Sequence, residues 1–270
     1  MNVVSEFLLM ANPLLFLPKP HPRSHKGQNG VVLIIGGSRT YHGAPVLAAL
    51  AAVRFCDLVY FSSTKENNLL LRRMKFSTPN VICVSGAAAK KAFAHADCIL
   101  IGNGMDVDAR TRSEVGRVLR SRKKCVIDAA ALRVLPLALL HKNVILAPHI
   151  GEFKAAFGIE GTPKNAAAVA KKYGCTILLK GKKDIAASPA ASVFITGGNA
   201  GMTKGGTGDV LAGLLAALWS HPDCPSPLSA AYSASVINKK AGDLLYIAFG
   251  PNFSSEDLAG ELSFAAKGLY

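Results

Sequence analysis

The sequence lacks the cysteine patterns that build disulfide frameworks or zinc sites. Its six cysteines are widely spaced, form no C-x-x-C pair and lie mostly within apolar runs. Structural zinc sites need closely spaced Cys and His ligands, and the sequence has neither such a cluster nor an H-E-x-x-H motif. We therefore expect buried free thiols, a reducing compartment such as the cytoplasm, and no metal ion held by the protein's own side chains.

The N-terminus also lacks the features of a targeting segment. Its apolar stretch, Phe7 to Ala11, follows Glu6 and is interrupted by Asn12-Pro13, and no Lys or Arg comes before Lys19. A secretory signal begins with basic residues, and a membrane span needs about 20 consecutive apolar residues. We predict neither a signal peptide nor an association with the membrane.

Acidic and aromatic residues are both scarce. The chain has 17 Asp and Glu against 31 Lys and Arg, a net charge of +14, and only 7% aromatic residues. Such a positive charge can bind nucleic acid, an anionic surface or polyphosphate ligands. The basic residues are scattered as pairs, with one denser stretch from Arg117 to Lys124, and no aromatic residues are interleaved with them. We therefore regard a non-catalytic nucleic-acid-binding protein as a less favoured alternative.

Apolar runs and helical stretches alternate along most of the chain. The first run, Val31 to Ile35, precedes an Ala-rich helix predicted from Ala44 to Phe55. Similar runs occur at residues 58–61, 81–84, 98–101, 126–127, 144–146 and 177–179. This alternation predicts an α/β protein with a mostly parallel sheet and helices on both of its faces.

The last third of the chain departs from this alternation. Two short runs, at 185–187 and 193–195, leave no room for a helix between them and predict an antiparallel, hairpin-like extension. From Asp209 onward the pattern is helical, in segments near 209–219, 227–247 and 255–266. We predict one domain that takes in the whole chain, residues 1–270.

Small and polar residues follow several of the apolar runs directly. They are Gly36-Gly37-Ser38, Gly102-Asn103-Gly104, Asp128, Pro148-His149 with Gly151-Glu152, and Lys180-Gly181. The carboxyl ends of parallel strands meet at one edge of a sheet, where ligands bind in open α/β folds. The sequence therefore predicts a single active-site edge.

The run Gly205-Gly206-Thr207-Gly208-Asp209 carries the main catalytic signal. Glycines let several backbone N–H groups point at one ligand, and an apolar helical period begins directly after the run, at Val210. The positive end of a helix favours an anion, and Asp209 there can act as a base. Thr-Gly-Asp before a helix is also an ordinary N-cap, but the doubled glycine and the loop Gly198 to Gly201 favour phosphate binding.

Known phosphate and nucleophile motifs do not fit the chain. No G-K-[ST] follows the glycine run, and no G-x-G-x-x-G opens the first helix, which weakens the P-loop and Rossmann interpretations. Ser38 lies in a run that resembles the nucleophile elbow of hydrolases, but Thr40 stands where the second glycine is needed. A serine hydrolase is therefore disfavoured.

The other strand-end residues each allow two interpretations. His149 can contact a ligand or fill the core, and Glu152 can orient a metal-bound water or cap the next helix. Lys180 can neutralise a nucleotide phosphate, whereas Lys182 and Lys183 can be a solvated turn. Asp128 can touch a hydroxyl or a metal ion, or cap the helix that follows.

Taken together and in order, these blocks resemble the ADP- or ATP-dependent NAD(P)H-hydrate dehydratases, a branch of the ribokinase-like superfamily. The resemblance runs from roughly Ser24 to Ala248. The matching blocks are Ser24-His25-Lys26-Gly27, Gly36-Gly37-Ser38 with Tyr41 and Gly43-Ala44-Pro45, Ile101-Gly102-Asn103-Gly104, Asp128 with Leu132, Pro148 to Phe153, Lys180-Gly181, and Gly198 to Gly213. The resemblance implies a three-layer α/β/α fold. We expect no fused epimerase domain, because only about thirty residues precede the first predicted strand.

The resemblance also implies a reaction. The family repairs hydrated NADH or NADPH, using a nucleotide to phosphorylate the ring hydroxyl and then eliminating phosphate. ADP is the expected nucleotide, with ATP as the alternative, and Mg²⁺ would bridge its phosphates. The family also implies a homo-oligomer, with a tetramer as the expected form, and a separate epimerase that acts on the same metabolite.

Site roles follow from the matching positions. Substrate contacts would come from Ala44, Gly104, His149 and Asp209. Nucleotide contacts would come from Lys180, Gly181, Lys182, Lys183, Asp184 and Gly208. Asp209 would take the proton of the substrate hydroxyl while the amides of Gly205, Gly206, Thr207 and Gly208 stabilise the phosphoryl charge.

Three positions depart from the usual pattern of the family. Ala130 stands where a second carboxylate is usual, Asn103 replaces a proline, and Ala147 replaces a threonine. The first puts any role of a second carboxylate in doubt. The main rival function is a ribokinase-superfamily kinase that phosphorylates a stable alcohol, such as a vitamin precursor or a sugar, and stops there.

Overall fold

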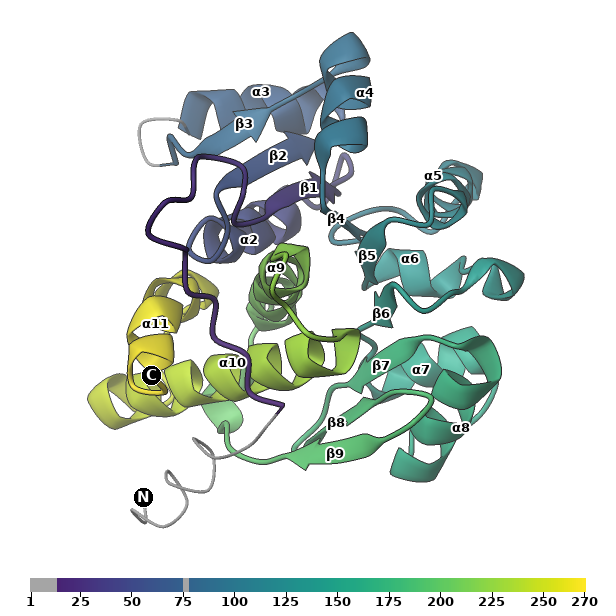
Figure 1. Cartoon of the computed structure of the whole chain (residues 1–270), viewed down its shortest axis with the longest axis vertical. Helices are drawn as coiled ribbons and strands as arrows, with labels where there is room; N and C mark the ends of the chain where they lie inside the picture. Colours follow the sequence, from purple (N-terminus) through teal and green to yellow (C-terminus); the bar gives the residue numbers. More distant parts are fainter. Residues whose placement is uncertain (1–13, 75–77) are drawn as a thin grey trace.

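One mixed sheet forms the centre of the molecule (Figure 1). The computed structural model describes residues 14–74 and 78–270, so the apolar stretch at 7–11 lies outside it. The nine strands are ordered β3-β2-β1-β4-β5-β6-β7-β8-β9. Seven are mutually parallel: β1 (Val31–Ile35), β2 (Leu58–Ser62), β3 (Val81–Cys83), β4 (Cys98–Ile101), β5 (Lys124–Ile127), β6 (Val144–Leu146) and β7 (Thr176–Leu179). The predicted extension is confirmed, because β8 (Asp184–Ala187) pairs antiparallel with β7 and β9 (Ser192–Ile195) pairs antiparallel with β8.

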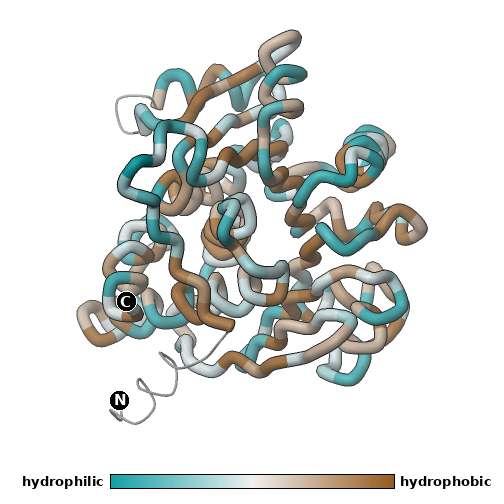
Figure 2. The backbone as a smooth tube through the Cα atoms, viewed as in Figure 1, coloured by the Kyte–Doolittle hydropathy of each residue, from teal (hydrophilic) through white to brown (hydrophobic). Residues whose placement is uncertain are grey.

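Helices cover both faces of this sheet, which confirms the predicted three-layer architecture. One face is covered by α2 (Gly43–Ala52), α9 (Thr207–Ser220), α10 (Pro227–Phe249) and α11 (Ser255–Lys267), with α3 (Lys65–Arg73) near the β3 edge. The other is covered by α4 (Gly86–His95), α5 (Ala109–Arg120), α6 (Ala130–Arg133), α7 (Ile150–Phe157) and α8 (Pro163–Tyr173). Strand β1 is buried along its whole length because it packs against both layers, as its unbroken apolar sequence predicts. Figure 2 shows the same division, with hydrophobic strands inside and hydrophilic segments outside.

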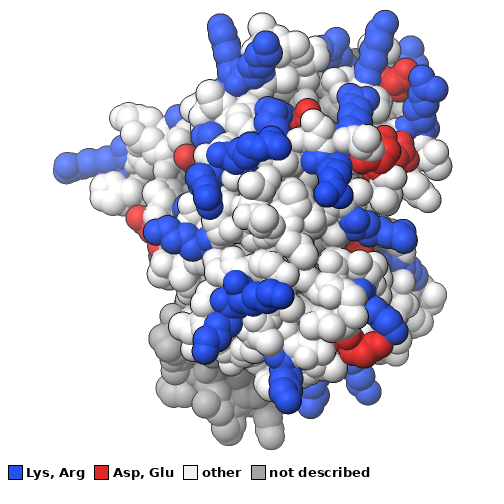
Figure 3. Space-filling model, turned by 90° about the vertical axis from the view of Figure 1, so that its right-hand side faces the viewer, with Lys and Arg blue, Asp and Glu red and all other residues white. Residues whose placement is uncertain are grey.

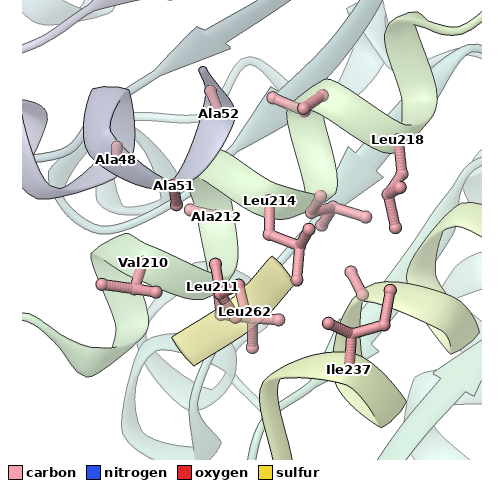
Figure 4. Packing of buried hydrophobic residues seen from close by; sticks show 14 of the residues in the cluster. Ala48, Ala51, Ala52, Val210, Leu211, Ala212, Leu214, Leu218, Ile237 and Leu262 are labelled. Atoms are coloured by element: carbon pink, nitrogen blue, oxygen red, sulfur yellow. The ribbon is translucent and has the colours of Figure 1, made fainter. Parts of the chain in front are cut away.

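Helices α2 and α9 lie unusually close together. A Cβ at Gly213 would fall 2.0 Å from the carbonyl oxygen of Ala48, so only glycine permits this approach. Figure 4 shows Ala48, Ala51 and Ala52 of α2 facing α9, whose leucines fill the core. This packing fixes α9, and with it the glycine run at its N-terminus.

The predicted helix boundaries shift at two places. The helix expected at 44–55 ends at Ala52, since the chain then turns back toward β2 and the N–H of Asp57 bonds to the carbonyl of Gly30. Helix α9 begins at Thr207 rather than at Asp209, which places Asp209 in its first turn.

The N-terminal lead-in lies across α10 and near α11 (Figure 1). The N–H of Phe16 donates to Ser233 Oγ of α10, and the hydroxyl of Tyr270 donates to the carbonyl of Pro18. The lead-in is therefore bound both to α10 and to the C-terminal residue of the chain.

All six cysteines are free, but they are not equally buried. Cys98, Cys125, Cys175 and Cys224 are buried, whereas Cys56 and Cys83 are partly exposed, so the expectation of uniformly buried thiols was wrong for these two. Cys56 follows the end of α2, and Cys83 is the last residue of the edge strand β3. Neighbouring elements cover side chains only partly at both places. In residues 14–74 and 78–270, no helix is both long and apolar enough to cross a membrane.

Lys and Arg side chains are spread over the face drawn in Figure 3, with uncharged surface between them. A few Asp and Glu side chains lie among them. The positive charge is therefore distributed over this face, as the scattered basic pairs of the sequence predict.

Candidate active site

The predicted strand-end residues do meet at the carboxyl edge of the sheet. The N–H of Gly37 bonds to the carbonyl of Asn103 at 2.8 Å, which joins the ends of β1 and β4. At the other side, the N–H of Lys180 bonds to the carbonyl of Pro148 at 2.8 Å, which joins the ends of β6 and β7. Local sequence rules predicted these residues one by one, and the parallel sheet brings them together.

An ion pair between a partly buried lysine and a buried aspartate lies in the middle of this edge. Lys180 Nζ, after β7, is 2.7 Å from Asp128 Oδ1, after β5, and 3.9 Å from Glu152 Oε2. Burial lowers the pKa of Lys180, but these carboxylates outweigh that effect and the pKa is raised, so the ammonium stays charged. Asp128 does not cap the following helix, since the N-cap of α6 is Ala129 and has no side-chain hydrogen bond.

Asn103 connects this ion pair to Asp209. Its Nδ2 donates to Asp209 Oδ1 at 2.6 Å and to Asp128 Oδ2 at 3.1 Å. Asn103 is fully buried, and its Oδ1 has no partner among the described residues. The sequence placed Asn103 among the strand-end residues of the predicted edge and marked it as a departure from the family pattern, but it did not predict this bridging position.

Asp209 lies in the first turn of α9 and has an elevated pKa. Burial raises its pKa to about 6, the hydrogen bond from Asn103 opposes this rise, and Asp128 adds to it by repulsion. A carboxyl group with a pKa near neutrality can both accept and release a proton at physiological pH, as a general base requires.

The glycine run shapes the loop that precedes α9. Gly206 is the N-cap with φ +94°, and a Cβ there would be 2.4 Å from Leu47 Cδ1. Because glycine has no side chain to cap the helix, the amides of the first turn remain available to an anion. Thr207 Oγ1 donates to the carbonyls of Met202 and Lys204, so this hydroxyl holds the loop.

His149 and Glu152 form a capping box at the start of α7. His149 Nδ1 accepts from the N–H groups of Gly151 and Glu152, and Glu152 Oε2 accepts from the N–H of His149. Capping is therefore confirmed for Glu152. In neutral His149 the proton must then lie on Nε2, which leaves that nitrogen as a donor, and the side chain is 60% exposed.

A cavity of about 600 Å³ opens beside the start of α9. It is lined by several predicted nucleotide contacts, namely Lys180, Gly181, Lys182, Asp184 and Gly208, and also by His149. Lys183 is exposed and does not line it. Lys180 reaches toward the anion-binding loop, since its Nζ is 3.6 Å from where a Cβ of Gly208 would lie.

Two further residues of this cavity come from α10 and were missed from the sequence. Lys239 Nζ lies 3.2 Å from the carbonyl of Gly197 and 3.5 Å from Asp184 Oδ1, while Asn238 Oδ1 is buried without a partner among the described residues. Asp184 itself holds the turn, accepting from the N–H of Gly181 and from Ser235 Oγ. The sequence does contain a signal for them, since Asn238 and Lys239 directly follow the apolar residues Val236 and Ile237 of a helix predicted to be buried.

The predicted substrate contacts Ala44 and Gly104 lie together on the other side of Asn103. A Cβ at Gly104 would be 3.2 Å from that of Ala44. Neither residue lines the cavity beside α9. The edge thus has two sides, a polyphosphate-sized cavity near Lys180 and a second surface near Ala44, with Asn103 and Asp209 between them.

No group of three or more His, Cys, Asp or Glu side chains among the described residues could hold a metal ion. Mg²⁺ commonly binds through substrate phosphates and water with one or two carboxylates, and a nucleotide-borne ion would find the carboxylates of Asp128 and Asp209 at this edge.

Comparison with known proteins identifies the family of the chain. The profile of the NAD(P)H-hydrate dehydratases matches residues 32–263. The chain belongs to this family. A relative from Nitrosopumilus maritimus named ADP-dependent (S)-NAD(P)H-hydrate dehydratase is 38% identical over 274 residues, covering 93% of this chain and 93% of its own length.

Solved structures support the fold of the family. That of the ADP/ATP-dependent NAD(P)H-hydrate dehydratase from Bacillus subtilis, co-crystallized with ATP and Mg²⁺, has a TM-score of 0.83 and 25% identity, covering 98% of this chain and 97% of that one. A ribokinase-like superfamily protein from Enterococcus faecalis has a TM-score of 0.82 and 24% identity, covering 98% and 94%. The predicted ribokinase-like fold is therefore confirmed.

Proposed function

We propose that this protein is an ADP-dependent (S)-NAD(P)H-hydrate dehydratase that repairs hydrated NADH and NADPH. The observation that carries the proposal is Asp209, a carboxyl group with a raised pKa in the first turn of α9, beside Lys180 and a cavity of nucleotide size. The name of the relative from Nitrosopumilus maritimus supports the reaction and the preference for ADP.

In the first step Asp209 accepts the proton of the ring hydroxyl, and the hydroxyl oxygen attacks the terminal phosphoryl group of ADP. The bond between the two phosphates breaks, which leaves AMP and a phosphorylated ring. Lys180 and the amides of the 205–208 loop stabilise the spreading charge, since both lie where that phosphoryl group would sit.

In the second step the phosphorylated oxygen leaves as phosphate. The lone pair of the ring nitrogen expels it, and loss of a proton from the neighbouring ring carbon restores the dihydropyridine. The site needs no redox group for this, because the product differs from the substrate only by water. His149 Nε2, as an exposed donor at the rim, is a proposed contact to the substrate together with Ala44 and Gly104.

Further properties are part of the proposal. Mg²⁺ enters with the nucleotide, ATP is the alternative nucleotide, and the whole chain acts as one catalytic domain in the cytoplasm. A separate epimerase acts on the same metabolite. A homo-oligomer, with a tetramer as the proposed form, is supported by the apolar side chains of Ile247 and Phe249, which are 80% and 59% exposed near the end of α10.

A direct assay separates this function from its rival. Purified protein is incubated with hydrated NADH, Mg²⁺ and ADP or ATP, and the absorbance band of reduced nicotinamide is followed. Recovery of the band with release of phosphate and AMP is expected with ADP. Accumulation of a stable phosphorylated alcohol, with no recovery of the band, would establish a superfamily kinase instead.

A further inference from the structure

The side-chain amide of Asn103 lies between two carboxyl groups of the site, that of buried Asp128 and that of partly buried Asp209. An amide nitrogen carries two hydrogens, and here one points to Asp209 Oδ1 at 2.6 Å and the other to Asp128 Oδ2 at 3.1 Å. The opposite orientation of the amide would place its oxygen against two carboxylates. The charges on both sides therefore decide how the amide is oriented.

The backbone of Asn103 is fixed as well. Its carbonyl accepts from the N–H of Gly37 at 2.8 Å, and the residue is fully buried at the end of β4. Its Oδ1 is buried without a partner among the described residues, an arrangement that costs stability. An apolar side chain could fill this space without the stability cost of an unpaired oxygen. The two hydrogen bonds that the amide donates therefore explain why an asparagine stands here.

We propose that Asn103 is a positioning residue for Asp209: it holds Oδ1 and ties it to Asp128, so that Oδ2 alone meets the substrate hydroxyl. Asp209 Oδ2 has no hydrogen-bond partner among the described residues, as this role requires. The inference rests on the proposed function in making Asp209 the base.

The charges around Asp209 give this contact a second consequence. Asp128 after β5 and Glu152 of α7 repel a charged Asp209, whereas Lys180 after β7 attracts it. Asn103 after β4 donates a hydrogen bond to the charged form and so lowers a pKa that burial raises. Removal of the amide should therefore raise the pKa of Asp209 and leave more of the base protonated.

The test uses Asn103→Ala and the isosteric Asn103→Asp in the full chain. Asn143→Ala is the matched control, because Asn143 lies before β6 at the opposite edge and its amide donates to the carbonyl of Arg122. The rate with hydrated NADH and ADP is measured as a function of pH. We expect both Asn103 variants to shift the acidic limb of kcat/KM upward by about one pH unit or more and to lower kcat by roughly 10- to 100-fold, with KM for ADP unchanged.

The second readout does not depend on the reaction. The Asp209 carboxyl is followed by ¹³C NMR, assigned through Asp209→Asn, in the wild-type protein and in each variant. In the wild type, the side-chain ¹⁵N–¹H signals of Asn103 should titrate with the same midpoint as Asp209. This second measurement needs no Asn103 variant to fold.

The two proposals fail in different ways. Wild-type signals of Asn103 that do not follow Asp209, or variants with unchanged midpoints and an unchanged pH profile, would overturn the role of Asn103 even in an active enzyme. Coupled titration in a protein that never restores NADH would retain the contact between Asn103 and Asp209 but overturn the proposed function, and with it the catalytic role of that contact.

Discussion

The two edges of the sheet use the same residue type in opposite ways. At the amino edge, Asp57 precedes β2 and accepts hydrogen bonds from the N–H groups of Gly27 and Asn29 and from the side-chain amide of Asn29. Burial alone would raise the pKa of Asp57, but these hydrogen bonds outweigh it and the pKa is lowered. At the carboxyl edge, burial dominates and the pKa of Asp209 is raised to about 6.

The difference lies in the number of donors around each carboxylate. Asp57 is surrounded by N–H groups of a single turn, so its charged form is satisfied and it stabilises the fold. Asp209 receives one amide hydrogen bond and lies near two further carboxylates, Asp128 and Glu152, so its charge is only partly compensated. An under-compensated carboxylate is destabilising and reactive, which distinguishes a functional edge from a structural one.

The largest effect is expected when the carboxylates of Asp209 and Asp57 are removed in separate variants and their turnover is compared. Asp209→Asn should lower turnover of hydrated NADH by a factor on the order of 10²–10⁴, as the loss of a general base does, while the nucleotide still binds. Asp57→Asn should leave turnover unchanged, because Asp57 lies at the other edge. Steady-state kinetics and ADP titration measure both, and an equal loss in the two variants would remove the distinction between the edges.

Lysines at the two edges should show the same contrast as the aspartates, with the larger loss of turnover at the carboxyl edge. Lys180→Met leaves Asp128 buried and unpaired, so we expect a destabilisation of about 3 kcal/mol and a fall in turnover of roughly 10- to 100-fold. Lys123 near the amino edge donates only to the carbonyls of Ala94 and Ala96. Lys123→Met should therefore change activity little. Chemical denaturation and kinetics test the pair, and full activity in Lys180→Met would exclude its role at the phosphoryl group.

Two adjacent glycines provide a finer comparison within the functional edge. Gly206→Ala forces a Cβ onto a residue with φ +94° and against Leu47, so we expect a loss of about 3 kcal/mol and a distorted anion loop. Gly205→Ala should be tolerated, since a Cβ there meets open space. Denaturation midpoints and KM for ADP distinguish the two. Equal changes in the two variants would show that both glycines are needed only because the ligand approaches the backbone closely, and that the φ of Gly206 is not important.

Much of this arrangement could be predicted from local sequence. Alternating apolar runs predict the parallel sheet, the residues after them predict the edge, and the glycine run predicts the start of α9. The partnership of Asn103 with Asp209 could not be predicted, because it joins residues 106 positions apart that meet only after the sheet forms. Asn238 and Lys239 were missed for a similar reason, since helical periodicity does not show which side of a buried helix borders a cavity.

The smallest effect concerns stability and its dependence on pH. The pKa of Asp209 is raised from 3.8 to about 6 on folding, so the native state binds more protons than the unfolded state between these values. Stability contributed by this group is present below pH 3.8 and is lost as the pH rises through 6. Asp57 has a lowered pKa, so its contribution is present above pH 3.8 and is lost as the pH falls through its folded value.

Asp209→Asn should therefore stabilise the protein by about 1 to 2 kcal/mol above pH 6 and lose that advantage near pH 4, because each pKa unit corresponds to about 1.4 kcal/mol and partial solvent access reduces the sum. Asp57→Asn should instead destabilise the protein at neutral pH. Thermal unfolding of both variants between pH 4 and 8 measures the two slopes. If Asp209→Asn showed no gain between pH 4 and 6, its carboxylate would be as well compensated as that of Asp57, and the two edges would not differ in this respect.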